Sequence, residues 1–145
     1  MTSPHDRTTV QDWMTESLIL VGPDEPLFAA LERMAEDHVR HVLVLDGEGG
    51  LRGIVSNRDV VRATALNPEH RLDLHSATVA QVMTPAPLTT VSPGTPVEEA
   101  ARAMVDRGVN ALPVLDKGRP VGIVSSEDLL RVLAHRCGAP PRPEL

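Results

Sequence analysis

Aromatic side chains are nearly absent from this 145-residue chain. They make up 1% of it, as Trp13 and Phe28, and there is no tyrosine. Many proteins hold single-stranded nucleic acid by stacking bases on aromatic rings, so this scarcity argues against such a platform. It also argues against an interface built on aromatic hot spots. The formal net charge of −6 gives the chain no electrostatic reason to bind nucleic acid or an anionic membrane surface.

Cysteine and long apolar runs are also scarce. Cys137 is the only cysteine, so no intrachain disulfide can form, and we expect a cytoplasmic protein. Residues 1–9 lack the apolar region of a signal peptide, and no apolar run approaches the ~20 residues of a membrane-spanning helix. The histidines lack metal-site spacing, and the sequence contains no nucleophile elbow, P-loop or dinucleotide fingerprint. We therefore expect no metal, no catalytic residue and no enzyme activity.

The chain does contain an internal repeat, with a period of 69 or 70 residues. Segments 10–15, 26–34 and 53–59 return as 79–84, 96–104 and 122–128. Each copy has the pattern of a strand–helix–strand–strand–helix unit, which predicts an α+β fold made of two similar units. The predicted boundaries are 8–66 for the first unit, 67–77 for a polar linker, 78–135 for the second unit and 136–145 for a mobile tail.

The helices that open the two units have clear sequence signals. The first is predicted at about residues 26–37, and the second at a capping box of Thr95 and Glu98 with a left-handed end at Gly108. Their apolar faces are expected not to be wholly core-facing; these residues are Leu27, Leu31 and Met34, and Val97, Ala101 and Met104. Each half has only about 65 residues, so neither is expected to fold well alone.

A serine and an aspartate three residues apart join a strand to a helix in each copy, as Ser56 with Asp59 and Ser125 with Asp128. One interpretation is a capping box. Another is a ligand site, because a helix N-terminus can bind phosphate and a carboxylate can accept hydrogen bonds from a ribose diol. The two interpretations are compatible. Gly53 or Gly122, just upstream, would let a ligand approach the backbone.

The repeated string Val-x-x-x-Met-Thr, followed by Val-Leu-Asp and Gly-Ile-Val-Ser-x-x-Asp, resembles the cystathionine-β-synthase (CBS) domain over residues 8–135. The resemblance implies a pseudo-two-fold pair with two clefts, each mixing residues of both copies. One cleft would use Thr9, Val10, Val39, Arg40, His41, Ser125 and Asp128. The other would use Ser56, Arg58, Asp59, Thr78, Val79, Asn110 and Ala111. In the family the aspartate binds ribose, and basic residues bind phosphates.

We therefore expect a non-enzymatic regulatory module that binds an adenosine nucleotide (AMP, ADP or ATP) and needs no other cofactor. The cleft of Asp128 and Ser125 is favoured because Arg40 and His41 join it, although Glu127 adds an acid there. An S-adenosylmethionine binder and a ligand-free structural or protein-interaction module are the alternatives. The expected partners are a second copy, placing four CBS units in a disk, and a separate effector protein, with neither nucleic acid nor membrane.

Overall fold

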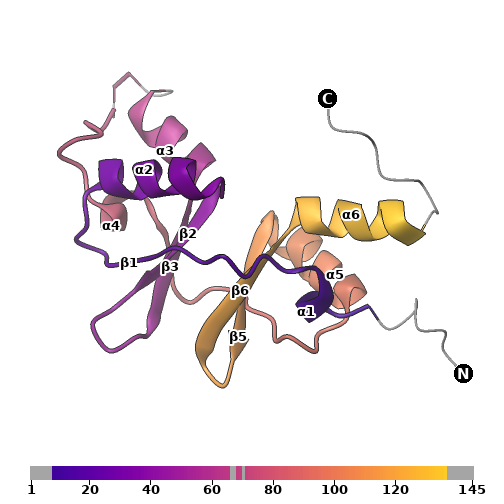
Figure 1. The fold of residues 1–145 in the computed structure, drawn as a ribbon. Coiled ribbons are helices and arrows are strands. Elements are labelled where there is room, and N and C mark those ends of the chain that lie inside the picture. Colours follow the sequence, from indigo (N-terminus) through magenta and orange to yellow (C-terminus); the bar gives the residue numbers. More distant parts are fainter. Residues whose placement is uncertain (1–7, 66–67, 70, 137–145) are drawn as a thin grey trace, which may run out of the picture. The chain divides into compact units, whose positions relative to one another are not determined.

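The structure, a computed structural model, describes residues 8–65, 68–69 and 71–136 of the chain. The chain divides into two compact units (Figure 1). The first-repeat unit comprises residues 17–88, and the second-repeat unit comprises residues 1–16 together with 89–145. The opening segment of the first repeat, residues 10–16, therefore belongs to the unit that holds the rest of the second repeat.

The first-repeat unit has the predicted strand–helix–strand–strand–helix order. Its elements are β1 (Leu20–Val21), α2 (Leu27–Asp37), β2 (His41–Leu45), β3 (Leu51–Ser56), α3 (Asn57–Thr64), α4 (Val79–Val82) and β4 (Thr84–Pro85). The strands form one sheet in the order β1-β2-β3-β4, in which β1 runs parallel to β2 and the other pairs are antiparallel. β2 and β3 are joined by a turn and form an antiparallel hairpin.

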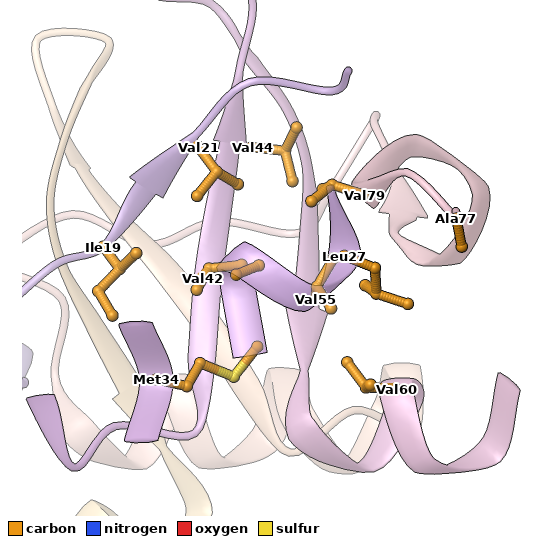
Figure 2. Close-up of a cluster of buried hydrophobic side chains, with 11 residues drawn as sticks. Ile19, Val21, Leu27, Met34, Val42, Val44, Val55, Val60, Ala77 and Val79 are labelled. Atoms are coloured by element: carbon orange, nitrogen blue, oxygen red, sulfur yellow. The ribbon is translucent and has the colours of Figure 1, made fainter. Parts of the chain in front are cut away.

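The core of this unit lies between the sheet and its helices. Leu27, Ala30 and Met34 recur at helical spacing on α2, and all three are buried. Figure 2 shows Leu27 and Met34 near Val42 of β2 and Val55 of β3. The cluster also contains Ala77 and Val79, and Leu72 and Leu74 pack against it. Part of the predicted linker therefore helps to close the core of the first repeat.

The second-repeat unit has the same plan with a shorter sheet. Its elements are α1 (Val10–Trp13), α5 (Val97–Arg107), β5 (Ala111–Asp116), β6 (Arg119–Ser125) and α6 (Ser126–Arg136). β5 and β6 form an antiparallel pair, and a single parallel bridge from Val91 to Val114 takes the place of an opening strand. Val10, Ala100, Met104, Leu112, Val114 and Val124 form the core.

Each unit is completed by the short opening segment of a repeat whose remaining residues form the other unit or follow it: residues 10–15 complete the second-repeat unit, and residues 79–84 complete the first-repeat unit. In Figure 1 the indigo α1 lies among the orange and yellow elements of the second-repeat unit. There Thr15 and Ile123 exchange two backbone hydrogen bonds of 2.8 and 3.0 Å. In the first-repeat unit, β4 pairs with β3 in the same way, with Thr84 opposite Ile54. The Val-x-x-x-Met-Thr string therefore serves as a docking segment in both units.

Two glycines make this docking possible. A Cβ atom on Gly53 would lie 2.7 Å from both the Sδ atom of Met83 and the carbonyl oxygen of Thr84. A Cβ atom on Gly122 would lie 2.6 Å from the Sδ atom of Met14. The glycines were predicted to let a ligand approach, and the close neighbour that they admit here is the docking segment of the chain itself.

One expectation about the opening helices is wrong. Thr95 does not cap α5, because its hydroxyl accepts a hydrogen bond of 3.0 Å from the backbone N–H of Ser92, and Pro96 occupies the N-cap position. The apolar faces of the two helices are mostly but not wholly buried: Leu27, Met34, Val97 and Met104 are at most 5% exposed, whereas Leu31 and Ala101 are partly exposed. The left-handed end at Gly108 is confirmed. Of the predicted tail, 136–145, all but Arg136 lies outside the described residues, as does Cys137.

Candidate ligand site

Ser56 and Asp59 form a capping box at the start of α3. The Oδ2 atom of Asp59 accepts a hydrogen bond of 2.8 Å from the backbone N–H of Ser56, and the Ser56 hydroxyl oxygen accepts one of 3.0 Å from the backbone N–H of Asp59. The capping interpretation is therefore confirmed for this pair. Asp59 is half-buried, and within residues 8–65, 68–69 and 71–136 its Oδ1 atom accepts no hydrogen bond from a protein donor.

The pair in the second repeat has the same cap and an additional partner. The Oδ2 atom of Asp128 accepts hydrogen bonds from the backbone N–H and the hydroxyl of Ser125, at 2.8 and 3.0 Å. Its Oδ1 atom accepts one of 3.0 Å from Arg131, whose guanidinium also contacts Glu127 at 3.3 Å. Asp128 is only 2% exposed. Both carboxylate oxygens of Asp128 are thus occupied by protein donors.

Arg131 is the site residue that the sequence interpretation missed. Its spacing of three residues from Asp128 and four from Glu127 places all three side chains on one face of α6. That spacing was the available signal. The equivalent residue in the first repeat is Arg62, and the equivalent of Glu127 is Arg58, so the first repeat has no carboxylate at that position to hold its arginine.

Arg40 and His41 lie beside Ser56. The carbonyl oxygen of Arg40 accepts a hydrogen bond of 2.9 Å from the backbone N–H of Asn57, the first residue of α3, and His41 is paired with Ser56 across the sheet. Val39, just before them, donates its backbone N–H to Met34 at 3.0 Å. The first-repeat unit therefore gathers Arg40, His41, Arg58 and Asp59 around one helix start.

Asn110 and Ala111 hold the same places in the second repeat. The carbonyl oxygen of Asn110 accepts a hydrogen bond of 2.9 Å from the backbone N–H of Ser126, and Ala111 is paired with Ser125. Neither side chain is basic. The immediate surroundings of Ser125 and Asp128 within their unit are therefore less basic than those of Ser56 and Asp59.

Each predicted threonine–valine pair lies at the start of the short helix of a docking segment, α1 or α4. Thr9 and Thr78 are the N-caps of α1 and α4, in capping boxes with Asp12 and Gln81. α1 contacts α6, and α4 contacts α3. The side chains of Val10 and Val79 are fully buried in the two cores. These valines can therefore offer a ligand only their backbone groups, because their side chains already fill the cores.

Neither a metal cluster nor a membrane helix is found in the part of the chain that the structure describes. No group of three or more histidine, cysteine, aspartate or glutamate side chains there could hold a metal ion. Likewise, no helix among residues 8–65, 68–69 and 71–136 has the length and apolarity needed to cross a membrane.

Comparison with known proteins identifies the family to which this chain belongs. The model of the CBS domain matches residues 10–66 and 79–135. A CBS domain-containing protein of Dictyostelium discoideum is 36% identical over 134 residues, covering 88% of this chain and 92% of that protein. The chain belongs to the CBS domain family. The predicted α+β fold of two CBS units is confirmed.

Other relatives place the same module in different settings. Homoserine O-acetyltransferase of Methanococcoides burtonii is 33% identical over 127 residues, covering 87% of this chain but 24% of the enzyme. The CBS domain pair of protein MJ0100, in complex with 5′-methylthioadenosine and S-adenosyl-L-methionine, has a TM-score of 0.76 at 26% identity and covers 89% of this chain and 98% of that one. The hexameric CBS-CP12 protein from bloom-forming cyanobacteria has a TM-score of 0.76 at 25% identity and covers 85% of this chain and 66% of that one.

Proposed function

We propose that this chain is a non-enzymatic regulatory module that binds an adenosine compound and passes the signal to a separate effector protein. The observation that carries the proposal is the similarity to the MJ0100 pair, which was solved with two adenosine-containing ligands. The shared serine–aspartate pairs support it, since a carboxylate beside a helix start suits a ribose diol. A mononucleotide with few phosphates fits best, because each repeat supplies few basic residues.

The carboxylates of Asp59 and Asp128 differ in how readily they can accept hydrogen bonds from a ribose. Asp59 can use its Oδ1 atom without breaking a contact to the described residues. Asp128 must first break its hydrogen bond to the guanidinium of Arg131 before its Oδ1 atom can accept one from a ribose. Its carboxylate is also almost fully buried. The sequence favoured Asp128 because Arg40 and His41 of the other repeat would join its cleft; within the first-repeat unit, the backbone of these two residues also lies beside the helix start of Asp59. We therefore assign the first ribose contact to Asp59, with Arg58 and Arg40 as phosphate ligands.

A thermal-shift panel of AMP, ADP, ATP, S-adenosylmethionine and 5′-methylthioadenosine tests the proposal. A ligand at ~100 times its dissociation constant adds about 2.7 kcal/mol of stability. For a chain of this length, that corresponds to a rise in melting temperature of roughly 5–10 °C. If no adenosine compound at millimolar concentration raises the melting temperature, the chain is a ligand-free interaction module instead.

Two substitutions separate ligand binding from helix capping. Asp59→Ala should remove most of the ligand-induced shift and lower the stability of the free protein by about 0.5–2 kcal/mol, as expected for a lost cap. Asp128→Ala should cost the free protein more, about 1–3 kcal/mol, because it leaves the partly buried backbone N–H of Ser125 without its acceptor. Glu36→Ala, an exposed acid on α2, is the charge-matched control. The 2′,3′-dideoxy form of the best ligand, which lacks both hydroxyls of the ribose diol, should bind both aspartate variants and wild type alike.

We also propose that the chain forms a homodimer through α6. Leu130 and Leu133, three residues apart on this helix, are 63% and 58% exposed. An ion pair of 2.6 Å between Arg136 and Glu98 holds α6 against α5. Two exposed leucines on one helix face favour burial against a second copy.

Light scattering at micromolar concentration tests this assembly. The wild type should have twice the mass of the chain, and the double variant Leu130→Glu with Leu133→Glu should have the mass of a monomer. Val109→Glu, at an apolar residue 40% exposed outside the helices, is the control and should leave the dimer intact. A monomeric wild type, with and without ligand, would refute the assembly.

A further inference from the structure

A surface pocket of about 400 Å³ lies in the second-repeat unit, away from Ser125 and Asp128. Its walls combine the hydroxyl-bearing residues Thr90, Ser92 and Thr95 and the carboxylate of Glu99 with the apolar side chains of Ala103 and Leu115. The pocket therefore combines oxygen acceptors with apolar side chains. None of these residues belongs to the candidate ligand site.

The internal repeat shows what fills the equivalent position in the first-repeat unit. Arg33 stands where the second repeat has Ala103, and its Nη1 atom donates a hydrogen bond of 3.1 Å to the carbonyl oxygen of Leu20. Leu20 corresponds to Thr90 of the pocket. In the first repeat, a guanidinium group on the chain itself thus occupies this place between the opening helix and the sheet edge.

The surrounding framework is the same in both repeats. Val21 runs parallel to Val44, and Val91 forms a parallel bridge with Val114. The turn that follows is closed in the first repeat by a hydrogen bond from the backbone N–H of Gly22 to Glu25, at 2.6 Å. In the second repeat the backbone N–H of Ser92 donates to Thr95 at 3.0 Å, in the equivalent position. The turn and the parallel pairing that frame this position therefore recur in both repeats, and the side chains around it differ.

The second repeat lacks this guanidinium, because Ala103 stands in the place of Arg33. It also has the carboxylate of Glu99 where the first repeat has Ala29. We propose that this pocket binds a guanidinium group supplied by another molecule. Its planar fork would donate to the Glu99 carboxylate and to the Thr90 carbonyl, as Arg33 does to Leu20. Its apolar stem would lie on Ala103 and Leu115, because long basic side chains bury their stems along apolar surface.

Titration of the full-length, ¹⁵N-labelled protein with N-acetyl-L-arginine methylamide tests the proposal. The amide signals of Thr90, Ser92 and Ala103 should shift in a saturable way. The citrulline analogue, which replaces the guanidinium by a neutral urea of the same shape, should bind at least fivefold more weakly. Agmatine, titrated in parallel, distinguishes the two sources of the group: tighter binding of the capped arginine indicates an arginine of a protein partner, and tighter binding of agmatine indicates a free small molecule.

Three variants complete the experiment. Ala103→Arg should abolish binding, because the new side chain can fill the pocket as Arg33 does in the first repeat. Glu99→Gln keeps the shape and should weaken binding about two- to fivefold, the effect of an exposed charge pair. Arg33→Ala opens the equivalent position beside Ala29, which has no carboxylate, and should not create a second site of similar affinity. Equal binding of the citrulline analogue, unchanged binding by a folded Ala103→Arg variant, or no shift at tens of millimolar ligand would overturn the proposal.

Discussion

Gly53→Ala tests whether the exchanged docking segments stabilise the fold. The added Cβ atom would lie 2.7 Å from the Sδ atom of Met83 and 2.7 Å from the carbonyl oxygen of Thr84. The thioether can rotate away, but the carbonyl belongs to β4, which is paired with β3 at this point. Backbone must therefore move, and overpacking of this kind typically costs 1–3 kcal/mol. We expect about 2 kcal/mol, or a melting temperature lower by roughly 4–8 °C.

Two further glycine variants calibrate that measurement by urea denaturation. Gly122→Ala should cost less, about 1 kcal/mol, because its nearest backbone atom, the carbonyl oxygen of Thr15, is 3.1 Å away and its closest neighbour is the mobile Sδ atom of Met14. Gly47→Ala has no atom within 4 Å of the added Cβ, so its effect should stay within about 0.5 kcal/mol. If Gly53→Ala unfolds at the same urea concentration as Gly47→Ala, the docking segment contributes little to stability.

Two more predictions concern the autonomy of the units and the response to acid. Residues 17–88 contain a complete unit and should melt cooperatively in circular dichroism, whereas residues 1–68 lack the buried Ala77 and Val79 and should not; the reverse order would contradict the assigned units. The backbone N–H groups of Gly50 and Glu48 hold the pKa of Asp46 below its ordinary value of 3.8. A carboxylate with a lowered pKa stabilises the fold above 3.8 and loses that effect as the pH falls through its folded pKa, so Asp46→Asn should flatten the acid side of a plot of stability against pH.

The helices and hairpins could be predicted from the sequence because their signals are local. The spacing of Leu27, Ala30 and Met34 requires one buried face of α2, and Gly108 marks the end of α5 through its left-handed backbone. The Ser56–Asp59 cap likewise depends only on residues three apart. Such features need no knowledge of distant contacts.

The features that could not be predicted depend on contacts between distant segments. Thr95 is held locally through its hydroxyl by the backbone N–H of Ser92, but its carbonyl oxygen accepts a hydrogen bond from Val10, in the docking segment near the start of the chain, which no local pattern indicates. The role of Gly53 depends on Met83, 30 residues later. The repeat showed that these positions recur, yet periodicity alone cannot show which repeat a docking segment completes.

The duplication also separates what the fold requires from what can vary. Both repeats keep the glycine–methionine contact and the serine–aspartate cap, and each of these has a structural reason that applies without any ligand. Folding therefore accounts for their presence in both repeats, whether or not the aspartates also bind a ligand. The side chains that differ, Arg58 against Glu127 and Arg33 against Ala103, lie on the same framework without being needed for it. Because a change at such a position alters charge and space while leaving the backbone contacts in place, these are the positions where one repeat can acquire a ligand preference that the other lacks.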